Sequence, residues 1–336
     1  MSRPGEVRGP DSPYAWTRLM ITLVIITMGA SGMYIVPVVL PVVQAEFGIA
    51  RAAASTSYSL LMIGFGVGGV LMGRLADRFG IHWPLAIGAV GMGAGFLLAA
   101  NAPDVWTFNL AHGLLIGFLG CSVTFSPLLA DTSLWFERRR GIAVAICASG
   151  NYLGGAIWPP VVQHFTQTVG WRTVYVGLAI VVSVTIFALS FLMRPRPPLA
   201  RASAKSSLNA HPSNLPFGLS PLSAQVMLCI AGLSCCVAMS MPQVHIVAYC
   251  ADLGYGPARG AQMLALMLGF GIVSRLASGF ICDRIGGLRT LLLGSFLQGV
   301  ALLLFLPFNG LVSLYAISIL FGLFQGGIVP SYAIIV

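Results

Sequence analysis

The sequence predicts an all-α polytopic membrane protein built from two related halves. Hydrophobic residues make up 57% of the 336 residues and charged residues 8%, whereas soluble proteins carry about 25% charged residues. Apolar runs of about 20 residues, the length that crosses a bilayer core, recur along the chain. A charged loop, GRLADRFG at 73–80, returns as GFICDRIG at 279–286, so that Asp77 and Asp283 lie 206 positions apart. This repeat indicates two halves of similar design.

The apolar runs account for ten predicted membrane helices. Pro or paired Gly occurs inside several of them, which membrane helices tolerate because neighbouring helices satisfy the freed backbone groups. We expect spans at residues 18–42, 53–73, 84–101, 105–133, 141–164, 172–193, 222–250, 258–280, 290–308 and 311–336.

The segment 194–221 divides the chain. It contains six Pro and many Ser, a composition typical of an irregular linker. We expect a six-helix bundle at 1–193, a cytoplasmic linker at 194–221, and a second bundle at 222–336 with four spans. Shifting the fifth and sixth spans by 206 positions places their counterparts near 347–399. The sequence therefore predicts a C-terminally truncated chain whose second bundle lacks its last two helices.

Basic residues predict the orientation. Only three of the 18 Lys and Arg residues, Arg51, Arg172 and Arg259, fall on the side opposite the N-terminus. Because positive loops stay in the cytoplasm, we expect a cytoplasmic N-terminus and a place in the plasma (inner) membrane. Such loops beside anionic lipid also explain the net charge of +9, so no nucleic-acid partner is expected.

No pattern of an enzyme, a metal centre or a primary pump occurs in the sequence. The seven Cys form no CxxC or Cys/His spacing, and there is no P-loop or Ser/His/Asp arrangement. We expect no catalytic residues, no metal, no cofactor and no disulfide framework. We also expect the protein to be a monomer.

The charged loops follow the second and eighth spans, on either side of the linker, and this layout resembles the major facilitator superfamily. Two stretches narrow the resemblance to monocarboxylate transporters and oxalate–formate antiporters. WFERRRGIAVAICASG at 135–150, followed by NYLG, resembles the start of their fifth helix, and RLASG at 275–279 resembles part of their eighth helix. The resemblance covers the whole chain and implies a secondary transporter with two six-helix bundles.

The charged loops are candidate gates. In the superfamily such a loop holds one half against the other in the outward-open state. The resemblance implies this role for Gly73, Arg74, Asp77, Arg78 and Gly80, and for Gly279, Asp283, Arg284 and Gly286. We expect Gly73 to allow close helix packing, Gly80 to allow a tight turn, and Asp283 to face a helix start near Gly141. The alternative is that these charges only set the topology.

Asp131 and Arg138 are a further candidate gate. They lie seven residues apart, which places them on one face of a helix. The spacing predicts a buried ion pair between them or a cytoplasmic gate.

Arg275 is the leading candidate for substrate binding. It precedes Asp283 by eight residues, which puts it about 12 Å deeper in the membrane than the loop. A buried guanidinium suits a carboxylate held by two hydrogen bonds. The resemblance implies a substrate-binding Arg here; the monocarboxylate transporters also carry an Asp one turn earlier, where this chain has Gly271. The alternative is an Arg that reaches the membrane interface.

Six more polar residues are candidates for the substrate pathway: Gln243, His245 and Tyr249 around Pro242, Tyr34 before Pro37, Asn151, and Gln325. Proline breaks and polar side chains are typical of transport pathways. A solvated helix end is the alternative for the residues around Pro242, an interfacial Tyr for Tyr34, and an inter-helix hydrogen bond for Asn151. His245 and His112 are candidates for proton coupling.

These features predict a secondary active transporter that moves a small organic anion, a mono- or dicarboxylate, by alternating access. The movement would be coupled to a proton or to an exchanged anion. One alternative is an efflux transporter of the same fold for drugs or amphipathic compounds. Another is a truncated product that transports nothing.

Overall fold

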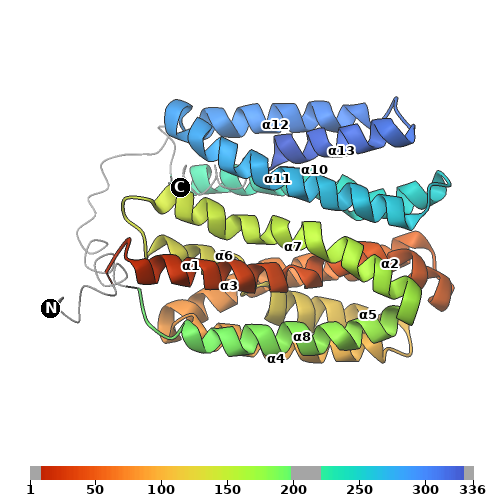
Figure 1. Cartoon of the computed structure of the whole chain (residues 1–336), viewed down its shortest axis with the longest axis horizontal. Helices are drawn as coiled ribbons and strands as arrows, with labels where there is room; N and C mark the ends of the chain where they lie inside the picture. Colours follow the sequence, from red (N-terminus) through yellow and green to blue (C-terminus); the bar gives the residue numbers. More distant parts are fainter. Residues whose placement is uncertain (1–8, 198–220, 329–336) are drawn as a thin grey trace.

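The computed structural model describes residues 9–197 and 221–328, and within these ranges every regular element is a helix. The long helices run side by side in one bundle (Figure 1). We call the end at which α8 finishes and α10 begins the linker end, and the opposite end the far end. The predictions for 198–220 and 329–336, which cover most of the linker and the end of the tenth span, lie outside the described residues.

The predicted all-α membrane fold is confirmed. Among the described residues, nine helical spans are long and apolar enough to cross a membrane. The first of them consists of α1 and α2, and the shorter α13 falls in the tenth predicted run. In chain order the elements are α1 (Pro13–Gly29), α2 (Ser31–Phe47), α3 (Arg51–Phe79), α4 (His82–Ala100), α5 (Val105–Leu110), η2 (Ala111–Cys121), α6 (Ser126–Ser133), α7 (Arg140–Val169), α8 (Trp171–Leu192), α10 (Pro221–Asp252), α11 (Pro257–Ile285), α12 (Gly287–Leu304) and α13 (Leu311–Gln325).

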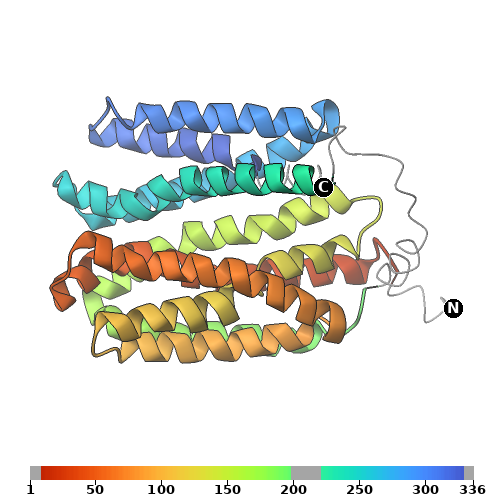
Figure 2. The same ribbon diagram turned by 180° about the vertical axis from the view of Figure 1, so that it is seen from behind.

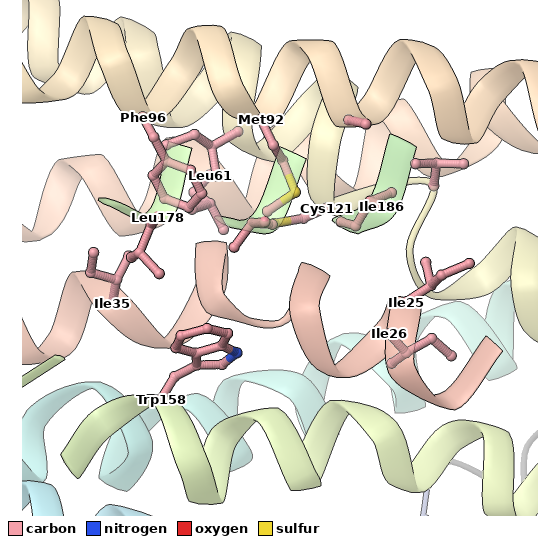
Figure 3. Close-up of a cluster of buried hydrophobic side chains, with 14 of the residues drawn as sticks. Ile25, Ile26, Ile35, Leu61, Met92, Phe96, Cys121, Trp158, Leu178 and Ile186 are labelled. Atoms are coloured by element: carbon pink, nitrogen blue, oxygen red, sulfur yellow. The ribbon is translucent and has the colours of Figure 1, made fainter. Parts of the chain in front are cut away.

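The first span breaks at Ala30, between α1 and α2. Side chains satisfy carbonyl groups around this break. The Trp158 indole N–H of α7 donates to the Thr27 carbonyl at 2.8 Å, and the Ser31 hydroxyl donates to the Met28 carbonyl at 2.7 Å. Figure 3 shows Trp158 rising from α7 toward the break. Pro37 and Pro41 do not cause the break, because both lie downstream of it inside α2.

The fourth span is also irregular. It consists of α5, the π-helix η2 and α6, with a turn between η2 and α6. Glycines of α3 lie directly against it: a Cβ on Gly64 would meet the Gly113 carbonyl oxygen at 2.1 Å, and one on Gly68 would meet the Phe118 carbonyl oxygen at 2.2 Å. Only glycine fits where two backbones approach so closely.

Apolar side chains fill the bundle and also cover its outside. The core of α1–α8 includes Leu61, Met92 and Phe96, which point toward one another (Figure 3). On the outside, Val184 of α8 and Phe296 of α12 are 63% and 70% exposed. An exterior this apolar belongs in lipid, because soluble monomers rarely expose large apolar patches.

The helices α1–α8 form one group and α10–α13 another (Figure 1). The two groups meet where α7 packs along α11 and α2 packs on α10. Seen from behind, α10 runs along the boundary between the groups (Figure 2). The boundary between α7 and α11 is where the candidate site lies.

Candidate functional site

Arg275 lies inside the contact between the two groups. Its side chain is only 2% exposed. Its Nη1 donates to the Ala148 carbonyl oxygen of α7 at 2.5 Å, and its Nε donates to the Gly326 carbonyl oxygen after α13 at 3.1 Å. The guanidinium therefore joins the two groups through main-chain carbonyls. The alternative of an Arg that reaches the membrane interface does not describe this geometry.

The charge of Arg275 is balanced by no carboxylate in the described part of the chain. Arg18 pairs with Asp131 and Arg172 with Glu46, whereas Arg275 forms no ion pair with a described residue. Arg275 instead lies over the Tyr152 ring, with Cζ 4.0 Å from the ring centroid. A cation over an aromatic face is stabilised but keeps its full charge, so the site favours an anion.

Gly271 makes room for this stacking. It lies one turn before Arg275 on α11, and a Cβ there would meet two ring carbons of Tyr152 at 2.9 Å. On α7, Ala148 and Tyr152 are likewise one turn apart, so each helix presents an i, i+4 pair to the other. The aromatic ring occupies the space that an acidic side chain at 271 would need.

Four of the predicted polar residues lie in two hydrogen-bonded pairs near this contact. The Gln243 amide of α10 donates to Gln325 Oε1 of α13 at 3.1 Å, and both side chains are buried. The Tyr34 hydroxyl of α2 donates to Asn151 Oδ1 of α7 at 2.9 Å. Gln325 precedes Gly326, which binds Arg275, and Asn151 precedes Tyr152. Sequence analysis therefore predicted several residues that the fold brings together.

An apolar cluster closes the contact on the far-end side of Arg275. We call it the far-end cluster. It combines residues of both groups: Ala30, Tyr34, Tyr152, Ile246, Val247, Cys250, Met263, Leu264, Leu268 and Leu314. Its members on α11 precede Arg275 by seven to twelve residues, or about 10–18 Å of helix. Along α11 the cluster therefore lies between Arg275 and the far end.

His245 and Tyr249 do not join the Arg275 contact. His245 is exposed, whereas Gln243 on the opposite side of α10 is buried. The Tyr249 hydroxyl donates to Asn309 Oδ1 at 2.8 Å, in the loop at the far end. Gln243 and His245 differ because side chains two positions apart on a helix point to nearly opposite sides. The positions of His245 and Tyr249 fit the alternative of a solvated helix end.

His112 is held inside the first group. Its Nδ1 lies 2.8 Å from the Phe108 carbonyl oxygen and its Nε2 lies 3.0 Å from the Tyr175 hydroxyl. A carbonyl only accepts, so Nδ1 carries the proton and Nε2 accepts from Tyr175. Both ring nitrogens are satisfied in the neutral form, which fits a structural role.

The glycines that end the two charged loops form turns as predicted, but Gly73 of the first loop does not pack as predicted. Gly80 has φ +89° and ends α3, and Gly286 has φ +83° before α12, so both turns need glycine. The expectation for Gly73 was wrong: a Cβ there would meet no atom within 4 Å, because that face of α3 is open in the described part of the chain. Arg74, Asp77 and Arg78 are exposed.

The second charged loop is only partly described. The side chain of Asp283 lies outside the described residues. Arg284 is exposed, and Gly279 and Gly141 have open space where a Cβ would point. The contact of Asp283 with the start of α7 stays a prediction.

Asp131 pairs with Arg18 and not with Arg138. Arg18 Nε and Nη2 of α1 lie 3.0–3.2 Å from the two carboxylate oxygens of Asp131, with both side chains buried, and Nη2 also donates to the Met193 carbonyl oxygen. The predicted pairing was wrong because α6 ends at Ser133 and α7 begins at Arg140. Asp131 and Arg138 therefore do not share a helix, and Arg138 is exposed.

Asp11 stabilises the loop between Asp131 and Arg138. Its Oδ2 accepts from the backbone N–H groups of Arg138 at 3.0 Å and Glu137 at 3.2 Å. The hydrogen bond from the Arg138 N–H lowers the pKa of the Asp11 carboxyl below its ordinary value. The link is therefore present at neutral pH and is lost as the pH falls through this lowered pKa.

Comparison with known proteins identifies the family. The family model of the Major Facilitator Superfamily matches residues 20–336. The chain belongs to the major facilitator superfamily. Its apolar exterior and helical spans are therefore those of a membrane-embedded transporter family.

Individual relatives within the superfamily are 26–30% identical to this chain over the aligned residues. Monocarboxylate transporter 13 of Bos taurus is 30% identical over 262 residues, covering 76% of this chain and 59% of the relative. MFS-type transporter opdF of Penicillium oxalicum is 26% identical over 267 residues, with the same two shares. MFS-type transporter YcxA of Bacillus subtilis is 27% identical over 301 residues, covering 87% of this chain and 72% of the relative. The chain spans 59% of the length of the first two.

The resemblance to the monocarboxylate transporter group is thus confirmed at the level of relatives. Sequence reasoning missed two residues of this superfamily member. Tyr152 belongs to the NYLG stretch and Arg18 begins the first predicted span, but neither is among the predicted site residues. In the sequence, Tyr152 follows Ala148 by four positions, as Arg275 follows Gly271. The contact between these two pairs is seen only in the fold.

Proposed function

We propose that this protein is a secondary transporter for a small organic anion, a mono- or dicarboxylate. One observation carries the proposal: Arg275 is 2% exposed, lies between the two helix groups, and has no carboxylate partner in the described residues. Burying an arginine within a membrane is costly, so such residues usually serve a function. A carboxylate would supply the missing charge and could be held bidentately by the planar guanidinium.

The substrate would compete with carbonyl groups for Arg275. In this structure Nη1 donates to Ala148 of α7 and Nε donates to Gly326. Because a carboxylate is a stronger acceptor than a neutral carbonyl, an entering anion would take over these donors. The link from α11 to Ala148 would then be released, which couples binding to movement between the groups.

Transport by alternating access would use the two groups as rocking units. We propose that residues 1–193 and 222–336 are these units, and that the far-end cluster is the closed gate in this state. The linker end would face the cytoplasm, with the charged loops of Asp77 and Asp283 stabilising the opposite state. A coupled proton or an exchanged anion would provide the driving force.

Uptake into proteoliposomes tests the proposal. Labelled mono- and dicarboxylates are offered to the wild type and to Arg275→Lys, with Arg259→Lys as control because Arg259 is exposed on the same helix. Lys keeps the charge but loses the planar fork, so uptake efficiency should fall about tenfold or more. Arg259→Lys should behave as wild type.

Two results would contradict the proposal. Unchanged carboxylate uptake by Arg275→Lys would remove Arg275 from the site. Failure of the wild type to move any carboxylate, together with dye efflux, would favour the efflux alternative.

A further inference from the structure

Tyr152 carries a buried hydroxyl that has no hydrogen-bond partner among the described residues. The side chain is 2% exposed, and its hydroxyl makes no hydrogen bond to any residue that the structure describes. Two other buried tyrosines are satisfied: the hydroxyl of Tyr34 pairs with Asn151 and that of Tyr175 with His112. Because an unpaired buried hydroxyl is costly, native proteins rarely keep one without a reason.

The ring of Tyr152 is fixed beside the guanidinium. One face lies under Arg275 at 4.0 Å, and ring atoms lie 2.9 Å from where a Cβ on Gly271 would be. With the guanidinium on one face and the Gly271 backbone beside it, the ring has little room to turn toward another partner. The hydroxyl is therefore held at the rim of the positive charge.

A second unpaired donor lies next to the same contact. Gln325 is fully buried; its Oε1 accepts from Gln243, but its Nε2 has no partner in the described residues. Gln325 directly precedes Gly326, whose carbonyl binds Arg275. A phenol O–H and an amide N–H₂ that lack partners in the described residues thus accompany a cation that has no carboxylate partner there. All three groups are hydrogen-bond donors.

We propose that the Tyr152 hydroxyl contacts the substrate, and that it completes a three-donor site for one carboxylate with Arg275 and the Gln325 amide. This inference rests on the proposed anion transport. A carboxylate offers about four acceptor positions, enough for these donors. Tyr152 belongs to α7, whereas Arg275 and Gln325 belong to the second group, so the bound anion joins both groups and Tyr152 sets specificity from the first.

The test is Tyr152→Phe, which removes the hydroxyl and keeps the ring under Arg275. Two quantities are measured on the full chain: the KM for the best-transported carboxylate in proteoliposomes, and the Tm of the ligand-free protein. The KM should rise about tenfold or more, the loss expected for a hydrogen bond to a charged group, while the maximal rate is largely retained. The ligand-free Tm should stay the same or rise, because an unpaired buried hydroxyl is removed.

Tyr175→Phe is the matched control. It removes a buried hydroxyl of the same half that is paired with His112, away from Arg275. It should lower the Tm and leave the KM within about twofold of wild type. A role of Tyr152 in folding alone would give this same pattern for Tyr152→Phe.

The outcomes separate the inference from the proposed function. An unchanged KM for Tyr152→Phe, with uptake still lost in Arg275→Lys, overturns the role of Tyr152 and leaves the anion transporter standing. A wild type that moves no carboxylate overturns both. A raised KM with an unaltered or raised Tm supports the inference.

Discussion

At the scale of single residues, the central feature is a buried cation whose partners are carbonyls and an aromatic ring. The position of Arg275 followed from its spacing to Asp283, because helix rise converts sequence distance into depth. The role of Tyr152 did not follow, because it depends on the packing of α7 on α11, where Arg275 lies 123 positions further along the chain. The pairing of Arg18 with Asp131 could not be predicted for the same reason, because these residues are also far apart in the sequence.

Gly271 should be intolerant of even one added carbon. In Gly271→Ala the new Cβ would press on the Tyr152 ring at 2.9 Å, and overpacking of this kind costs about 1–3 kcal/mol. Gly269→Ala is the control, since its Cβ would meet only Ala156, at an ordinary 4.0 Å. Thermal unfolding in detergent should show destabilisation for position 271 and none for 269. Equal stability of the two variants would contradict the close contact.

The buried ion pair of Arg18 and Asp131 should matter far more than an exposed one. Asp131→Asn leaves the Arg18 charge buried without its partner, which should cost about 3–5 kcal/mol. Glu46→Gln disrupts the Arg172 pair, whose side chains are 38–40% exposed, and should cost about 0–1 kcal/mol. Unfolding of the two purified variants compares them. A similar small loss in both would mean that the Arg18 pair is not a structural tie.

At the scale of elements, apolar run length predicted where helices lie but not where they break. The expected runs match the spans because length and composition are local properties of the sequence. The break at Ala30 and the π-helix Ala111–Cys121 depend instead on partners elsewhere. The indole of Trp158 and the glycines of α3 stabilise these irregular segments only once the bundle has formed.

Trp158 should therefore stabilise the broken first span. Trp158→Phe keeps an aromatic ring but leaves the buried Thr27 carbonyl without its donor, which should cost about 1–3 kcal/mol. Trp106→Phe, at a side chain 75% exposed, should change stability by no more than about 0.5 kcal/mol. Unfolding curves that place both variants at the same midpoint would show that the indole hydrogen bond does not support the break.

At the scale of the whole molecule, composition and the repeated loop were enough to predict the membrane class and the superfamily, and the family match confirms both. The relation between the helix groups could not be predicted, because the contacts between α7 and α11 join distant parts of the sequence. Those contacts determine which polar residues lie near Arg275 and which, like His245, are exposed.

The proposed orientation can be tested by labelling. In a chain without its native cysteines, Pro103→Cys lies in an exposed loop at the far end and Glu137→Cys in an exposed loop at the linker end. An impermeant maleimide added to intact cells should label the first, and should label the second only after permeabilisation, because basic loops remain cytoplasmic. The reverse pattern would invert the topology.

Equilibrium binding to the purified full chain tests the central claim most directly, since it isolates Arg275 from any coupling step. Calorimetric titration of the best-transported carboxylate into wild type, Arg275→Lys and Arg259→Lys compares their dissociation constants. We predict a Kd for Arg275→Lys that is about tenfold or more above wild type, and a Kd for Arg259→Lys equal to wild type. Equal Kd values for all three proteins would contradict an anion site at Arg275.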